Sequence, residues 1–147
     1  MVHRASASRL LVAAFVILLP LHATARNTEH FFPLAAALAS ERGNLIEIPV
    51  YLKGQSHPEG SVIEHVTVSR SSRGVFRGDE ASCHVAALSV LRELQEHARR
   101  SGGDAIIDIV STTRGTTTES ATDYRCVAGA IVVHVALRGT IVKLGAK

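Results

Sequence analysis

Apolar side chains recur every three or four positions through the middle of the chain. Between Glu80 and Arg100 they form a stripe made of Cys83, Ala87, Val90, Leu91, Leu94 and Ala98. This spacing predicts an amphipathic helix whose stripe faces the core. The Gly78-Asp79 step is typical of a helix start, and Gly102-Gly103 of a helix end.

Extended segments are predicted on both sides of this helix. They are residues 45–52, 62–69, 105–110 and the run from 124 to 142, which are rich in Val, Ile and alternating apolar positions. Pro49 cannot donate to a ladder, so the first segment is expected at a sheet edge. The polar stretch 111–120 predicts a hairpin loop. The last run is expected to bend near Gly129 or Gly139.

A short helix is predicted near the N-terminal end of the domain. Residues 32–39 are rich in Ala, Pro33 suits a first turn, and Gly43 a stop. Together the segments predict an α+β fold: a mostly antiparallel sheet of about four strands, with the long helix (about 80–100) and the short helix packed on it.

The first 25 residues have the pattern of a cleaved secretory signal peptide. Arg4 and Arg9 precede an apolar run over 10–19, and small residues at Ala23 and Ala25 predict cleavage before Arg26. The apolar run is too short to span a bilayer, so no stable membrane anchor is expected after cleavage. Residues 26–147 are then one domain, periplasmic or secreted from a Gram-negative bacterium.

Charge and composition narrow the choice of partner. The chain has 147 residues with 16 Lys+Arg and 13 Asp+Glu, and removal of the leader leaves an excess of one basic residue. Nucleic-acid binders carry a wider basic footprint and more aromatic side chains than this chain, so no nucleic-acid partner is expected.

The two cysteines, Cys83 and Cys126, are predicted to form a disulfide in an oxidising compartment. A loop of this size would stabilise the domain by about 4 kcal/mol. The alternative is a metal-binding or thiol-redox protein that uses Cys83, His84 and Cys126. Cys-x-x-Cys and His-x-x-x-His pairs are missing from the sequence, so no cofactor is expected.

A basic segment precedes the long helix. Arg70, Arg73 and Arg77 lie within residues 68–77 and are interpreted as a solvated, possible interaction loop. With 112–118 it could form a patch that binds a protein or an envelope component. The sequence contains neither a phosphate-binding Gly-x-x-x-x-Gly-Lys-Ser/Thr loop nor a Gly-x-Ser-x-Gly elbow, so no catalytic residues are assigned.

Several short motifs resemble one family. They are Asp79-Glu80-Ala81-Ser82-Cys83, Gly103-Asp104-Ala105-Ile106-Ile107-Asp108, Ala121-Thr122-Asp123-Tyr124-Arg125-Cys126 and Val135-Ala136-Leu137-Arg138-Gly139-Thr140. The chain resembles small exported proteobacterial proteins commonly labelled "excinuclease ATPase subunit". It is more distantly similar to the YbjQ-like heavy-metal-binding fold and to the Rcs envelope-stress sensor lipoprotein.

The resemblance implies an exported α+β domain with Cys83 bonded to Cys126. The DNA-repair activity in the family label is not carried over, because this chain has no Walker motif and no zinc-finger cysteines. Lipid anchoring is not carried over either, because no Cys lies near the expected cleavage site. The function expected from the sequence is therefore a non-catalytic binding or interaction domain of the cell envelope.

Overall fold

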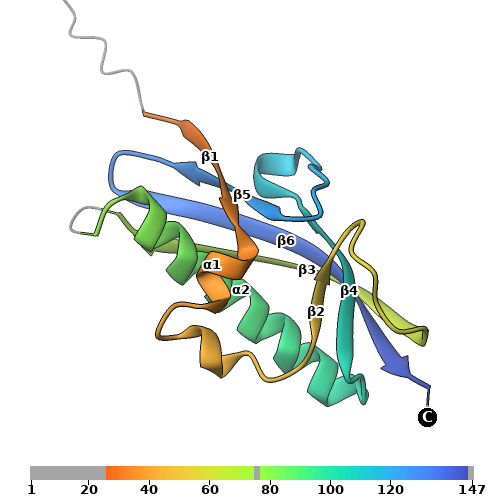
Figure 1. The fold of residues 1–147 in the computed structure, drawn as a ribbon. Helices are drawn as coiled ribbons and strands as arrows, with labels where there is room; N and C mark the ends of the chain where they lie inside the picture. Colours follow the sequence, from red (N-terminus) through yellow and green to blue (C-terminus); the bar gives the residue numbers. More distant parts are fainter. Residues whose placement is uncertain (1–25, 75–76, 146–147) are drawn as a thin grey trace, which may run out of the picture.

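A sheet covered on one face by a long helix forms the framework of the protein (Figure 1). The computed structural model describes residues 26–74 and 77–145; the expected signal peptide, 1–25, and its cleavage residues Ala23 and Ala25 lie outside them. The elements are β1 (Thr28–Pro33), α1 (Leu34–Leu38), a 3-10 turn (Gly43–Leu45), β2 (Val50–Leu52), β3 (Gly60–Arg73), α2 (Asp79–Ser101), β4 (Ala105–Ser111), a second 3-10 turn (Thr113–Gly115), β5 (Asp123–Ala128) and β6 (Val132–Leu144).

The longest ladder of the sheet joins β3 and β6. β3 pairs with β6 along one side, while β5 and then β4 pair with successive parts of its other side. β1 lies outside β5, and β2 lies outside β4. All of these pairs are antiparallel except β2 with β4. The α+β, mostly antiparallel prediction is confirmed, but the expected size of about four strands is wrong, because the described residues form six.

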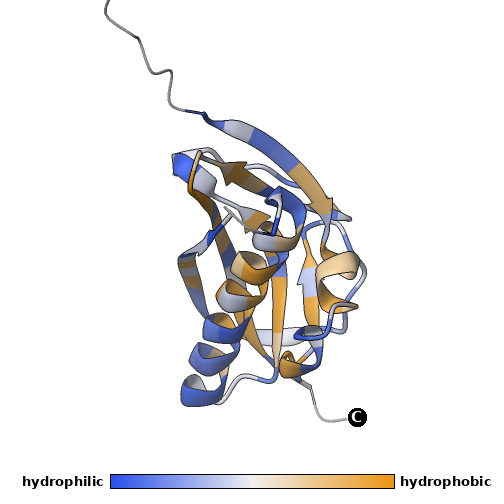
Figure 2. Cartoon of the chain, turned by 90° about the vertical axis from the view of Figure 1, so that its left-hand side faces the viewer, coloured by the Kyte–Doolittle hydropathy of each residue, from blue (hydrophilic) through white to orange (hydrophobic). Residues whose placement is uncertain are grey.

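The predicted long helix is confirmed as α2. Its buried side includes Cys83, Val90, Leu91 and Leu94, each 0 % exposed. This stripe packs against the sheet face that carries Val66, Val68, Val135, Leu137 and Ile141. Figure 2 shows the matching hydropathy, with mostly orange strands behind the helix and blue last turns of α2. The left-handed Gly102 (φ +79) ends the helix, as the sequence predicts.

The two cysteines meet in this core. Cys83 on α2 and Cys126 on β5 are both fully buried, and their Sγ atoms lie 2.03 Å apart. The bond therefore joins the helix to the sheet within the hydrophobic core, and the predicted pairing is confirmed. No helix among the described residues is long and apolar enough to cross a membrane.

The N-terminal part differs from the prediction in its boundaries. Residues 28–33 form β1 instead of beginning the short helix, because they find a partner strand in β5. The predicted strand 45–52 is reduced to β2, since a 3-10 turn ends at Leu45. Pro49 lies just before β2, at the sheet edge that was expected for it, and its carbonyl accepts a hydrogen bond from the Ile106 amide.

The polar stretch after β4 is not a hairpin loop. β4 and β5 do not pair with each other, because both pair with β6, one after the other along the same side. The connection 112–122 therefore separates two strands, β4 and β5, that pair with successive parts of the same edge of β6. It contains the 3-10 turn Thr113–Gly115 and bridges back to Ser111 through Thr118.

A β-bulge in β4 occurs next to a glycine of β6. Asp108 and Ile109 together lie opposite Gly139, and Asp108 takes a positive φ of 51°. A Cβ atom on Gly139 would lie 2.6 Å from Ile106 Cγ2 and 3.3 Å from Ile109 Cγ1. The missing side chain of Gly139 thus leaves room for both isoleucines on the helix-covered face, and the bulge turns Asp108 away from that core.

Candidate functional site

Polar side chains gather on the face of the sheet opposite α2. Since side chains alternate along a strand, residues between the core positions of β3 and β6 share this second face. Cross-strand pairs place them side by side: His65 with Thr140, Thr67 with Arg138, Ser69 with Ala136, and Ser71 with His134. We call the face defined by these eight residues the polar face.

A cavity of about 490 Å³ opens on the polar face. Its lining residues come from three strands and two connections: Lys53, His65, Asp108, Val110, Glu119, Arg138 and Thr140. Lys53 directly follows β2, and Glu119 belongs to the connection between β4 and β5. A sheet floor with walls made by connecting segments is a common design of binding sites.

Charges of both signs line this cavity. The Lys53 ammonium lies 3.4 Å from an Asp108 carboxylate oxygen, with both side chains part-exposed. Arg138 and Glu119 are exposed, and neither forms an ion pair within 26–74 and 77–145. The cavity therefore holds one cation and one anion whose charges no described side chain neutralises.

A histidine and a hydroxyl group supply hydrogen-bonding capacity beside these charges. His65 Nδ1 lies 2.9 Å from Thr140 Oγ1, so the two side chains orient each other across the β3–β6 ladder. Thr140 is only 7 % exposed and forms part of the cavity floor. His65 itself is exposed and lines the cavity, so its imidazole can contact a ligand there.

A second histidine lies farther along the polar face. His134 is held between two hydroxyl groups, with Ser69 Oγ 3.0 Å from its Nε2 and Ser71 Oγ 3.0 Å from its Nδ1. Burial and the charge of Arg114 lower the pKa of His134. The lowered pKa favours the neutral imidazole, and the two hydroxyl groups hold the orientation of the ring.

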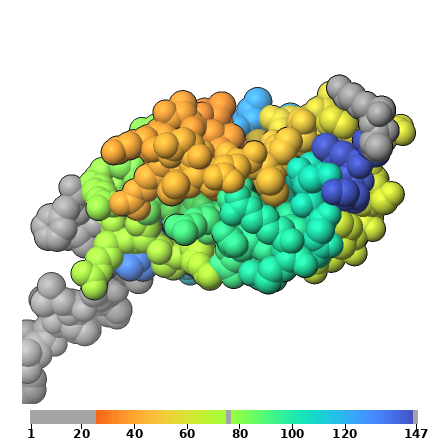
Figure 3. All heavy atoms as spheres, turned by 90° about the horizontal axis from the view of Figure 1, so that it is seen from below, coloured from red at the N-terminus to blue at the C-terminus, as the bar shows by residue number. Residues whose placement is uncertain are grey.

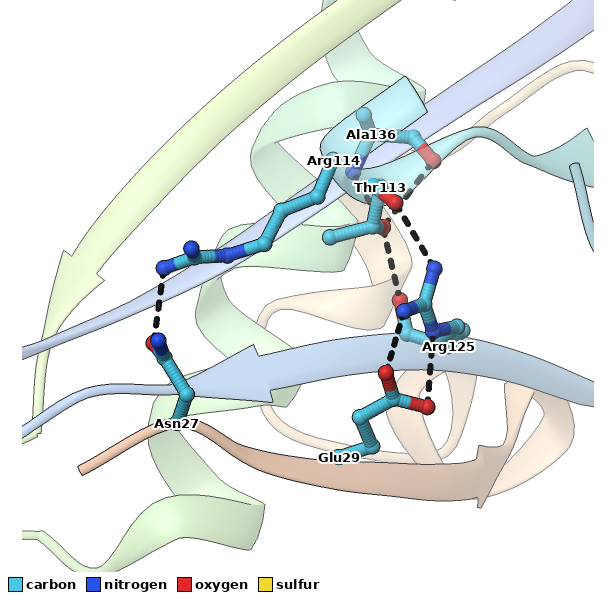
Figure 4. Close-up of polar contacts among 6 residues, drawn as sticks. All are labelled: Asn27, Glu29, Thr113, Arg114, Arg125 and Ala136. Atoms are coloured by element: carbon cyan, nitrogen blue, oxygen red, sulfur yellow. Dashed lines mark hydrogen bonds and ion pairs between the residues drawn. The ribbon is translucent and has the colours of Figure 1, made fainter. Parts of the chain in front are cut away.

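The wall that carries Glu119 is anchored by an ion pair between the buried Arg125 and the half-exposed Glu29 (Figure 4). Arg125 on β5 donates to the Thr113 carbonyl oxygen at 2.7 Å and to both carboxylate oxygens of Glu29, at 2.5 and 3.3 Å. Thr113 Oγ1 in turn donates to the Arg125 carbonyl oxygen, and Arg114 reaches Asn27. The start of the connection is thereby fixed to both β5 and β1.

The three arginines of the predicted interaction loop do not form one loop patch. Arg70 and Arg73 belong to β3, which is longer than expected because its ladder with β6 continues to Val132. Their odd spacing places them on opposite faces, and Arg70 pairs with Glu93 of α2. Arg77 is exposed in the turn before α2. The loop assignment of Arg70 and Arg73 is therefore wrong, and any binding role for these residues stays a prediction.

The residues of the alternative thiol or metal site take other partners. Cys83 and Cys126 are bonded to each other. His84 Nδ1 lies 2.7 Å from the Tyr124 hydroxyl group, and burial, followed by the charge of Glu80, raises the pKa of Tyr124. Within 26–74 and 77–145, no group of three or more His, Cys, Asp or Glu side chains is arranged to hold a metal ion.

The cavity residues on β4 and β6 are not predicted by the sequence pattern. One signal was present: His134, Arg138 and Thr140 interrupt an apolar run at even spacing, as expected for one polar face of a strand. Lys53, Asp108 and Glu119 carried no such signal, because only the tertiary fold brings them to this face.

Comparison of the chain with protein-family models, with curated proteins and with solved structures gave no match. The resemblance drawn from the sequence motifs therefore stays an expectation.

Proposed function

We propose that the protein is a non-catalytic binding domain of the cell envelope, and that the cavity on its polar face binds a ligand carrying both a positive and a negative charge. One observation carries this proposal: Arg138 and Glu119 line the same cavity with opposite charges that no described side chain neutralises. A ligand that carries both charges would satisfy both residues at once.

Short zwitterionic peptides fit this chemistry best. The guanidinium group of Arg138 offers paired donors to a carboxylate, and the Glu119 carboxylate accepts hydrogen bonds from an ammonium group. Thr140 and His65 can bond to the peptide groups between the two ends. A volume of about 490 Å³ is within the usual range of small-ligand sites. We accordingly propose that the ligand is a short peptide of the cell envelope.

Export is part of the same proposal. The leader pattern in residues 1–25 and the buried Cys83–Cys126 bond both fit an oxidising compartment. The pairing of Arg125 with Glu29 ties β1, which follows the expected cleavage site, to the domain, so β1 belongs to the mature fold.

Calorimetric titration with three related dipeptides tests the proposal. Ala-Ala carries both charges, N-acetyl-Ala-Ala lacks the ammonium group, and Ala-Ala amide lacks the carboxylate. We expect Ala-Ala to bind most tightly and each blocked peptide to lose about tenfold or more, the typical value of a charge-assisted hydrogen bond. Equal binding of all three peptides, or no binding of Ala-Ala, would contradict the proposal.

Two variants connect each charge to its residue. Arg138→Gln is expected to bind Ala-Ala as weakly as the native protein binds Ala-Ala amide, and Glu119→Gln as weakly as it binds N-acetyl-Ala-Ala. Arg92→Gln, on the exposed side of α2, is the matched control and should bind normally. Mass spectrometry of the recovered Ala-Ala should find it intact, whereas its hydrolysis would overturn the non-catalytic part of the proposal.

A further inference from the structure

The outer edge of β3 is a long strand edge that no described strand covers. β3 runs over Gly60–Arg73 and pairs only with β6 among the described residues. From Glu64 to Arg73 its ladder with β6 has no bulge. Seen from below, the yellow-green atoms of β3 border the molecule next to the teal atoms of α2 (Figure 3). A long regular edge of this kind is a template for pairing with another strand.

The side chains along this edge are self-complementary. If two copies of β3 pair antiparallel about Thr67, residue 64 lies opposite residue 70 of the other copy, and residue 66 opposite residue 68. This register places Glu64 opposite Arg70 twice, and Val66 opposite Val68 twice. Opposite charges and β-branched side chains are favourable cross-strand neighbours.

The charges at these two positions are accessible to a second copy. Glu64 forms no ion pair among the described side chains, so its charge is not neutralised within the chain. Arg70 pairs with Glu93, yet its side chain stays 48 % exposed. Because a guanidinium group has five donors, Arg70 can maintain its ion pair with Glu93 and donate hydrogen bonds to a second carboxylate.

The register also determines where the two helices lie. Directly opposite residues share a face, and both Glu64 and Arg70 are on the face that α2 covers. The two copies of α2 therefore lie on the same side of the joined sheet. Beside β3 each helix presents a mixed-charge hollow lined by Arg70, Ser89, Arg92, Glu93, Glu96 and Arg100. Two such hollows meet across the axis with both signs of charge on each side.

From this geometry we infer that the protein forms a symmetric dimer through antiparallel pairing of β3 with β3 of a second copy, in the register centred on Thr67. The two sheets become one continuous sheet, and the two cavities of the polar face open on the same side. The pairing uses the backbone edge of β3, and among the cavity-lining residues only His65 lies on that strand, so the inference does not depend on the proposed function.

Charge variants and their mixture test the register. Sedimentation velocity of the native protein should show a monomer–dimer equilibrium. Glu64→Lys places Lys opposite Arg70, and Arg70→Glu places two carboxylates opposite each other, so each variant alone should weaken the dimer about tenfold or more. A mixture of the two variants restores opposite charges at both positions and should recover the dimer. Glu59→Lys, just before β3, is the matched control and should dimerise normally.

Disulfide cross-linking provides a second readout in an otherwise native chain. Thr67→Cys puts two thiols next to each other on the axis, and mild oxidation should give a covalent dimer. Ser61→Cys lies at the far end of β3, away from the axis, and should not cross-link to itself. A native protein that stays monomeric at all concentrations overturns the inference. A monomer that binds an extended peptide along β3 in place of a second copy overturns it as well. A dimer that Ser61→Cys cross-links as well as Thr67→Cys overturns the register.

Discussion

Arg125 is buried on β5 with only 6 % of its side chain exposed, and it forms a two-pronged ion pair with Glu29, 96 residues earlier in the chain. Its Nη1 donates to the Thr113 carbonyl oxygen. One guanidinium group thus connects β1, β5 and the start of the connection that carries Glu119. The position of the connection that forms the Glu119 wall of the cavity therefore depends on the contacts of Arg125 with Glu29 and Thr113.

The ion pair predicts an asymmetry between its two partners. Glu29→Gln leaves the Arg125 charge buried without a carboxylate, whereas Arg125→Met leaves Glu29 half-exposed in water. We therefore expect Glu29→Gln to lower the free energy of unfolding more than Arg125→Met does, as measured by urea denaturation. The reverse order would show that the pair does not stabilise the buried cation.

The same pair makes a contribution to acid sensitivity. The hydrogen bond from Arg125 lowers the pKa of Glu29 below the usual glutamate value of 4.5. The contribution of Glu29 is complete above that value and is lost as the pH falls below it toward the lower native pKa. Denaturation over this acid range should therefore show a smaller pH dependence for Glu29→Gln than for the native chain.

The core disulfide predicts a large loss of stability on its removal. Cys83 and Cys126 are 43 residues apart, and a closed loop of this length stabilises a domain by about 4 kcal/mol. The double variant Cys83→Ala, Cys126→Ala should lose about that much free energy of unfolding in urea titrations. Reduced native protein should behave similarly, and an unchanged midpoint in both would refute the structural role of the bond.

The close packing of β4 against Gly139 can be tested by adding one methyl group at that glycine. Gly139→Ala introduces a Cβ atom into the space used by Ile106 and Ile109, and overpacking of this kind costs about 1–3 kcal/mol. Gly145→Ala, where nothing lies within 4 Å of the new atom, is the control. Thermal unfolding should separate the two variants; equal stability would mean that the close packing around Gly139 is not required.

His134 predicts a pH dependence near neutrality. Because burial and Arg114 lower its pKa below 6.5, the unfolded chain binds a proton more readily than the native chain. The free energy of unfolding should be fully maintained above about pH 6.5 and should decrease as the pH falls below it. His134→Gln should flatten this part of the profile, and a profile that this variant leaves unchanged would contradict the account.

The sequence predicted the features that depend on local pattern. The helix stripe of α2 and its glycine end can be recognised over a few turns, and an even pair of cysteines leaves one possible intramolecular bond. The boundaries of β1 and β3 could not be predicted, because a strand extends as far as its partner does. Local polarity alone favoured a loop for Arg70 and Arg73, but the neighbouring β6 keeps them in the ladder.

The candidate site was beyond prediction for a related reason. Lys53, Asp108 and Arg138 come from segments far apart in the sequence, and the positive φ of Asp108 arises from a bulge that only the strand register reveals. The even spacing of His134, Arg138 and Thr140 could have indicated a polar sheet face. It could not have indicated the acidic partners on that face.

Mapping of backbone amide shifts in nuclear magnetic resonance spectra, during titration of the native protein with Ala-Ala, tests the central claim most directly. Binding in the cavity predicts saturable shifts centred on Lys53, Asp108, Glu119, Arg138 and Thr140. Shifts should be small around the less polar hollow beside α1, which Leu34, Leu38 and Val50 help to line. Saturable shifts at that hollow instead, or no shifts on the polar face, would contradict the account.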